Sequence, residues 1–264
     1  MVNSLRLDYE KAWLDRIIWM IIIGVLLINI LNLTDEINLH PSRESSSVLY
    51  FWVYRHGLGA FSIMAVMLSG CGYASSFFRE KEAGSWKYYL IRQRILSYGV
   101  SKIIVTLSTA VLSVFAAYLI LLLFLSSKYP LFPDTADEII QIVNDRSFLE
   151  VALNRNMLFF FLNIIPEVLM FGFLSVFSLC VALFARSKYA VIASPLLIYY
   201  GWNYISGTFS MPDVLCWPLK MDRGFQYLDN SVWNTLFTGA YYLAGIVLLS
   251  LLFILQIRKA AEYA

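Results

Sequence analysis

Residues that commonly do chemistry are sparse in this sequence. The only histidines are His40 and His56, and neither belongs to an H-E-x-x-H zinc motif. The sequence also contains no G-x-S-x-G nucleophile motif and no G-x-x-x-x-G-K-[ST] phosphate loop. We therefore predict that the chain is not an enzyme, that it has no catalytic residue or metal site, and that it does not bind ATP through a phosphate loop.

One short motif imitates an ATP-binding signature. Leu68-Ser69-Gly70-Cys71-Gly72 looks like the signature sequence of an ATP-binding-cassette (ABC) ATPase, but it lies inside an apolar run with no phosphate loop beside it. Small residues in such a run let helices approach each other closely. We interpret the motif as a helix-packing element.

Basic residues are concentrated in the segment 79–102, which holds six of the 20 Lys and Arg residues of the chain. The segment begins with the triplet Glu80-Lys81-Glu82, whose solvated charges are suited to end a membrane span. Gly84 follows, and glycine permits a sharp turn because it tolerates left-handed backbone angles.

The residues after this turn form one apolar face. Trp86, Tyr89 and Leu90 recur at helical spacing, which predicts an amphipathic helix. Two roles fit such a helix: a positively charged anchor that lies on lipid, or a surface that a cytosolic partner binds.

The elements that must position this segment are apolar helices. The 264 residues are 59% hydrophobic and 14% charged, whereas soluble domains carry about 25% charged residues. Crossing a membrane takes about 20 mostly apolar residues in helical form. We predict an all-α integral membrane protein with a single transmembrane domain, residues 1–264. Its six predicted spans are 17–33, 57–78, 103–125, 157–185, 189–206 and 235–256.

The distribution of Lys and Arg predicts the orientation. With both termini on one side, that side holds thirteen of the 20 basic residues, so the positive-inside rule makes both termini cytoplasmic. Residues 4–16 are predicted as an amphipathic interfacial helix, with Leu5, Tyr9 and Trp13 at helical spacing. We expect a multi-pass protein of the plasma membrane of a bacterial cell.

Two long loops lie on the predicted outer side. The segment 135–152 has apolar residues among acidic ones and is predicted to be a small helix on the membrane surface. The loop 207–234 contains apolar stretches that are broken by proline. It fits either a re-entrant segment or an ordinary loop with interfacial aromatic residues.

The basic segment resembles the corresponding loop in type-2 permease subunits of ABC exporters. The family pattern is E-[RK]-E-x-G-[ST], then aliphatic residues, a basic stretch and finally [GS]-K. The chain has E-K-E-A-G-S at 80–85, Y-L-I at 89–91, R-Q-R at 92–94 and S-K at 101–102. The predicted six-span layout and the leading amphipathic helix are also similar to that family.

The resemblance implies a permease subunit that catalyses nothing itself. Two permease subunits, identical or homologous, would form the pathway, and a separate cytosolic ABC ATPase would bind ATP and magnesium. The loop 79–102 would then act as the coupling lever. The coupling residues would be Glu80, Glu82, Gly84, Ser85, Trp86, Tyr89, Leu90, Arg92 and Arg94. The chain itself would need no cofactor, and its partners would be these subunits and lipid, not nucleic acid.

The acidic outer face and the apolar interior would suit a cationic amphipathic peptide, so we expect peptide export. The predicted spans contain one acid, Glu167, and no base. Such sparse charge argues against an ATP-independent secondary transporter, the main alternative. A multi-span membrane scaffold is a third possibility.

Glu167 has two interpretations. In one, Pro166 kinks a helix that begins at Met157, and Glu167, about 15 Å deep, faces the translocation pathway. In the other, the helix begins late, with Pro166 in its first turn and Glu167 beside the helix N-terminus.

Overall fold

The computed structural model describes residues 2–14, 16–40, 46–55, 61–92, 95–143, 146–209 and 230–262. Within these ranges all regular secondary structure is helical, which confirms the all-α prediction. The helices are α1 (Val2–Leu14), α2 (Arg16–Leu39), α3 (Val48–Tyr54), α4 (Phe61–Cys71), α5 (Tyr73–Glu82), α6 (Ser85–Arg92), α7 (Ile95–Lys128), α8 (Ala136–Ile142), α9 (Arg146–Leu153), α10 (Leu158–Phe184), α11 (Lys188–Thr208) and α13 (Ser231–Glu262).

Four helices in the described part of the chain are long and apolar enough to cross a membrane: α2, α7, α10 and α13. They contain the predicted spans 17–33, 103–125 and 235–256 and match 157–185 to within one residue at each end. Their apolar runs are continuous, and a helix is the form that satisfies every backbone hydrogen bond within one segment.

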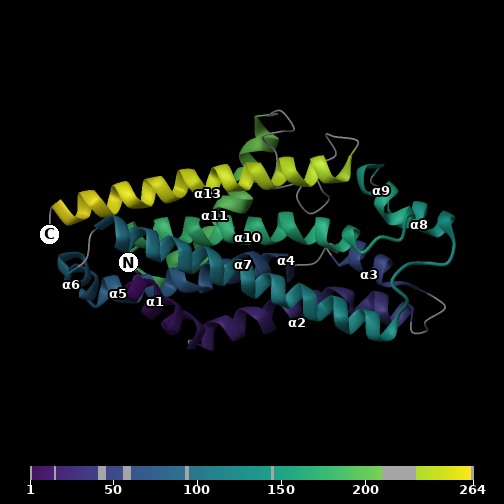
Figure 1. Cartoon of the computed structure of the whole chain (residues 1–264), viewed down its shortest axis with the longest axis horizontal. Coiled ribbons are helices and arrows are strands. Elements are labelled where there is room, and N and C mark those ends of the chain that lie inside the picture. Colours follow the sequence, from purple (N-terminus) through teal and green to yellow (C-terminus); the bar gives the residue numbers. More distant parts are fainter. Residues whose placement is uncertain are drawn as a thin grey trace.

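Helix α10 is the centre of the bundle. It packs against α4, α5, α7, α11 and α13 (Figure 1). In its most apolar stretch 61% of the residues are buried, against 22% for α13. Helix α13 therefore lies at the edge of the bundle, with one apolar face outward.

The bundle has two distinct ends (Figure 1). Helix α6 lies at one end, together with the beginning of α1 and the C-terminal end of α13. Helices α3, α8 and α9 lie at the other. We refer to these as the α6 end and the α8 end.

The second predicted span, 57–78, is wrong as a continuous helix. The described residues form α4 and α5, and the helix breaks at Gly72, whose ψ of −147° is not helical. The Ser75 hydroxyl donates a hydrogen bond of 2.9 Å to the Gly72 carbonyl at the break. Gly70 lies so close to α11 that an added Cβ would be 2.8 Å from the Ile192 carbonyl oxygen, which confirms the helix-packing interpretation of this motif.

A short turn joins α10 to α11. The Ser187 side chain accepts a hydrogen bond from the Ala190 backbone N–H and so caps α11. Helix α11 extends the predicted span 189–206 by one or two residues at each end. It is not among the four helices that are long and apolar enough to cross a membrane, because Lys188 and several tyrosines dilute its apolar residues.

The outer segment 135–152 is two short helices instead of the single helix that was predicted. Helix α8 ends at Val143, whose φ of −92° and ψ of 86° lie outside the helical region. Helix α9 follows. Of the loop 207–234, residues 210–229 lie outside the described part of the chain.

Candidate functional site

The triplet at the end of α5 sends its three side chains in different directions. Each residue of a helix is rotated by about 100° from the previous one, so neighbours cannot share a face. Glu80 points into the protein, Lys81 reaches the end of α10, and Glu82 is exposed.

Glu80 belongs to a buried charged network. One of its oxygens, Oε2, lies 2.8 Å from the Lys102 ammonium, and the other, Oε1, lies 3.7 Å from the Lys11 ammonium. The Lys102 side chain is only 2% exposed. Glu80 therefore links α5 to α7 and to α1.

Asp8 of α1 completes this network. Its carboxylate accepts hydrogen bonds from Lys102 at 2.9 Å, from the Tyr73 hydroxyl at 2.7 Å and from the Ser101 hydroxyl at 2.5 Å. Two carboxylates thus face two ammonium groups, and the charges balance. We call Asp8, Lys11, Glu80 and Lys102 the α6-end network.

The neighbours of Lys11 stabilise its ammonium. Partial burial by itself lowers the pKa of Lys11, but the combined effects of Glu80, Tyr89 and Asp8 outweigh it and leave the pKa above the usual 10.5. The Lys11 ammonium also lies 5.4 Å from the ring centroid of Tyr89. Helix α1 is thus fixed to the bundle by charge as well as by its apolar side chains.

Lys81 caps the C-terminal end of α10. Its ammonium donates hydrogen bonds to the carbonyls of Ala182 at 3.1 Å, Leu183, and Ala185 at 3.2 Å. A helix leaves its last carbonyls without intrahelical donors, and a lysine beside them also interacts favourably with the helix dipole. Burial lowers the pKa of Lys81.

The turn between α5 and α6 depends on Gly84. Its φ of +70° lies in the left-handed region, as expected for a glycine that ends a helix. The backbone N–H of Gly84 donates to the Lys81 carbonyl at 3.0 Å, and the Ser85 hydroxyl donates to the Glu80 carbonyl at 3.0 Å. The predicted sharp turn is confirmed.

Helix α6 turns part of its apolar face toward this chain itself. Trp86 is half-buried against the cluster that includes Phe77. Tyr89 is 36% exposed and stacks on Tyr98 with 6.3 Å between ring centroids. Glu82 and Tyr88 are exposed instead. The side chains of Leu90, Arg92 and Arg94 lie outside the described part of the structure.

Nearer the α8 end, Glu167 forms a buried ion pair with Arg55, just after α3. The guanidinium carbon lies 3.8 Å from the ring centroid of Trp52 and 5.0 Å from that of Tyr118. The predicted spans contained no base, and Arg55 was placed in the outer loop. The structure corrects this by burying Arg55 inside the helix bundle.

The structure also decides between the two interpretations of the helix around Glu167. Helix α10 begins at Leu158, whose backbone N–H donates to the Asn156 side chain at 3.0 Å. The late start is therefore wrong, and Pro166 lies inside the helix. Proline leaves the carbonyl four residues earlier without its donor. That carbonyl, of Leu162, accepts a hydrogen bond of 3.4 Å from the Thr235 hydroxyl of α13.

Sequence reasoning missed Arg55 because it started the second crossing at residue 57. The signal was the apolar stretch V-L-Y-F-W-V-Y of α3 immediately before it. Among the described residues, no group of three His, Cys, Asp or Glu side chains could hold a metal ion.

The long apolar helices indicate that the chain is a multi-pass helical membrane protein. Comparison with protein-family models, with curated proteins and with solved structures finds no match.

Proposed function

We propose that the chain is the membrane-spanning permease subunit of an ABC exporter in a bacterial plasma membrane. The six crossings would be α2, the broken segment from α3 to α5, α7, α10, α11 and α13. The α6 end would face the cytoplasm, since that side holds most of the basic residues. A separate ATPase and a second permease subunit would complete the transporter.

The proposal rests on the contacts that the motif residues 80–102 make with α1, α7 and α10. Glu80 and Lys102 stand at the two ends of the motif, 22 residues apart, and they form an ion pair. Lys81, between them, holds the end of α10. A displacement of α6 would therefore be transmitted to α1, α7 and α10 together, as a coupling lever requires.

The ATPase would contact the outward side of α6 and the turn before it. The exposed fraction of Tyr88 is 72%, and Glu82 is exposed beside it. This assignment shifts the docking surface away from Trp86, which packs on the core of this chain.

The substrate would be a cationic amphipathic peptide. Pro166 and Glu167 remain the candidates for the pathway. In this conformation Glu167 is paired with Arg55, and a separation of α3 from α10 would leave its carboxylate facing a cationic substrate. A cationic substrate would then replace Arg55 as the partner of Glu167, which is needed because a charge is not stable in an apolar interior without one.

A second candidate is an ATP-independent secondary transporter. The Arg55–Glu167 pair favours it, since ionisable residues inside a helix bundle often mark ion or proton pathways. The two candidates differ in their source of energy.

The test uses the double variant Glu82→Lys/Tyr88→Ala, which changes only exposed residues. We expect the variant chain to insert normally but to lose the copurifying ATPase and ATP-dependent transport. Tyr204→Ala is the matched control, because Tyr204 is 76% exposed on α11 near the end farther from α6. Retention of the ATPase by the double variant would refute the docking surface. Transport that continues without ATP and stops when the proton gradient is collapsed would establish the secondary transporter.

A further inference from the structure

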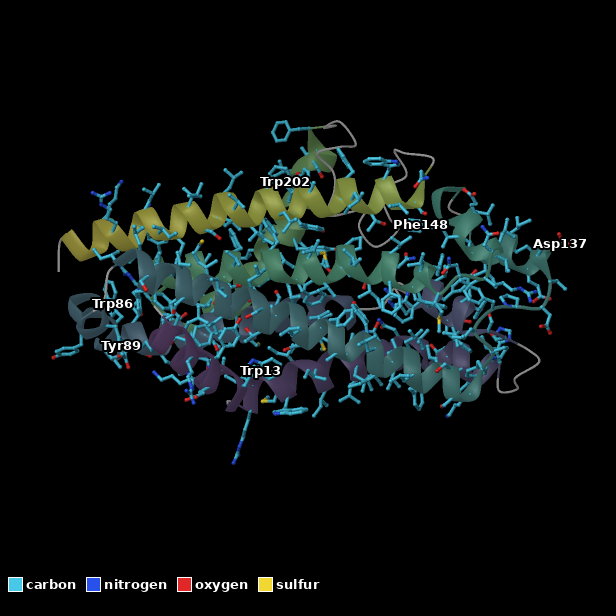
Figure 2. All side chains as sticks on the ribbon, viewed as in Figure 1. Trp13, Trp86, Tyr89, Asp137, Phe148 and Trp202 are labelled. Atoms are coloured by element: carbon cyan, nitrogen blue, oxygen red, sulfur yellow. The ribbon has the colours of Figure 1, made fainter. Side chains whose placement is uncertain are left out.

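The ends of α5, α6, α10 and α13 enclose a cleft of about 360 Å³ at the α6 end. Its walls include Phe77, Trp86 and Phe184 on the apolar side and Lys81 and Lys259 on the charged side. Figure 2 shows Trp86 at this end of the bundle. The volume lies in the range of small-ligand sites, about 300–1,000 Å³.

The positive charge of this cleft is not neutralised within the described part of the chain. The ammonium of Lys81 is bonded to three neutral carbonyls, and no carboxylate lies within ion-pair distance of it in the described ranges. The nearest acid in sequence that points inward, Glu80, is bound to Lys102. Lys259 is exposed at the rim of the cleft. Lys81 and Lys259 together give the mouth of the cleft a positive potential, and such a potential attracts an anion.

The apolar side of the cleft lies where a membrane-spanning helix ends. Phe184 is the last residue of α10, and it is 68% exposed. Phe77 is buried in the wall. Aromatic and basic residues together are typical of the boundary between hydrocarbon and water. The occupant that matches this surface has a negative head and an apolar tail.

We propose that this cleft binds an anionic phospholipid of the cytoplasmic leaflet. Its phosphate binds Lys259 at the rim and lies in the positive field of Lys81, whose N–H groups stay on the carbonyls of α10, and an acyl chain lies against Trp86 and Phe184. Charge complementarity and the apolar wall select the lipid over a free phosphate ion. The choice of leaflet rests on the orientation proposed above, with the α6 end cytoplasmic, but the proposal does not depend on what the chain transports.

The test measures the fluorescence of Trp86 in the purified full chain. Phosphatidylglycerol and phosphatidylcholine, each with brominated acyl chains, serve as quenchers, and subtraction of the Trp86→Phe spectrum isolates the signal. We expect brominated phosphatidylglycerol to quench Trp86 at lower mole fractions than brominated phosphatidylcholine. Equal quenching by the two lipids, or no quenching by either, would overturn the proposal.

Variants at Lys259 test the charge without disturbing the cap on α10. Lys259→Gln should lower the preference for phosphatidylglycerol about fivefold, the effect of one lysine beside an anionic surface. Lys259→Arg should keep the preference, and Lys128→Gln, at the end of α7, should leave it unchanged. A preference that persists in Lys259→Gln would refute the site. Displacement of the lipid by inorganic phosphate at millimolar concentration would instead identify a soluble-anion site and refute lipid binding.

Discussion

Glu167→Gln should destabilise the helix bundle strongly, although the substitution preserves the size of the side chain. It leaves the Arg55 guanidinium buried without a negative partner. Removal of one member of a buried pair costs about 3–5 kcal/mol. The stacking of the guanidinium on Trp52 remains, so the loss comes from the charge pair.

The double variant Arg55→Met/Glu167→Gln separates the charge effect from simple packing damage. With both charges removed, no uncompensated ion is left in the bundle, and the double variant should be more stable than Glu167→Gln by about 2 kcal/mol. The difference in stability between the two variants is measured by thermal unfolding of the full chain in one detergent, followed by tryptophan fluorescence. Glu167→Gln should lower the Tm by roughly 6 °C or more, and the double variant should recover part of that loss. If the double variant unfolds as early as the single variant, the pair is not the source of the destabilisation.

Three further predictions concern the α6 end and the orientation. Lys102→Met should cost about 3 kcal/mol or more of stability, because Lys102 is buried between two carboxylates. Lys11→Met should cost less than about 1 kcal/mol, because the Lys11 side chain is 50% exposed. Equal losses of stability in thermal unfolding would contradict the α6-end network. Gly84→Ala should lower stability by roughly 1 kcal/mol through strain at φ +70°, and a Tm equal to that of the native chain would show that the turn relaxes. In a cysteine-free background, Thr135→Cys should react with a membrane-impermeant thiol reagent in intact cells and Glu82→Cys only after the membrane is opened; the reverse pattern would invert the orientation.

The long helices could be predicted because each is a continuous apolar run. Helix α10 was located to within one residue at each end, and α11 to within two. The break at Gly72 could not be predicted from the sequence, since it depends on a backbone angle that only the packed bundle selects. The outer helix was predicted as one piece because its apolar spacing continues across the break at Val143.

The charged contacts were beyond sequence reasoning for a different reason. Asp8 meets Lys102 across 94 residues, and Arg55 meets Glu167 across 112. No local spacing encodes such pairs, which arise from how the helices pack. The sequence did indicate two unusual residues. Glu167 is an acid in an apolar run, and Gly84 is a glycine that follows a charged triplet.

The separation of Arg55 from Glu167 also bears on how the chain is made. Ribosomes add about 5–20 residues per second, so the carboxylate emerges roughly 6–22 seconds after the guanidinium that it neutralises. During that interval Arg55, which directly follows α3, has no counter-charge from α10. An unpaired arginine costs up to about 2.5–3.5 kcal/mol on insertion scales, the value for the middle of a membrane helix. If this part of the chain crosses a membrane as proposed above, burial of Arg55 is unfavourable until α10 has been made. The final packing of α3 therefore depends on α10, which follows it in the chain.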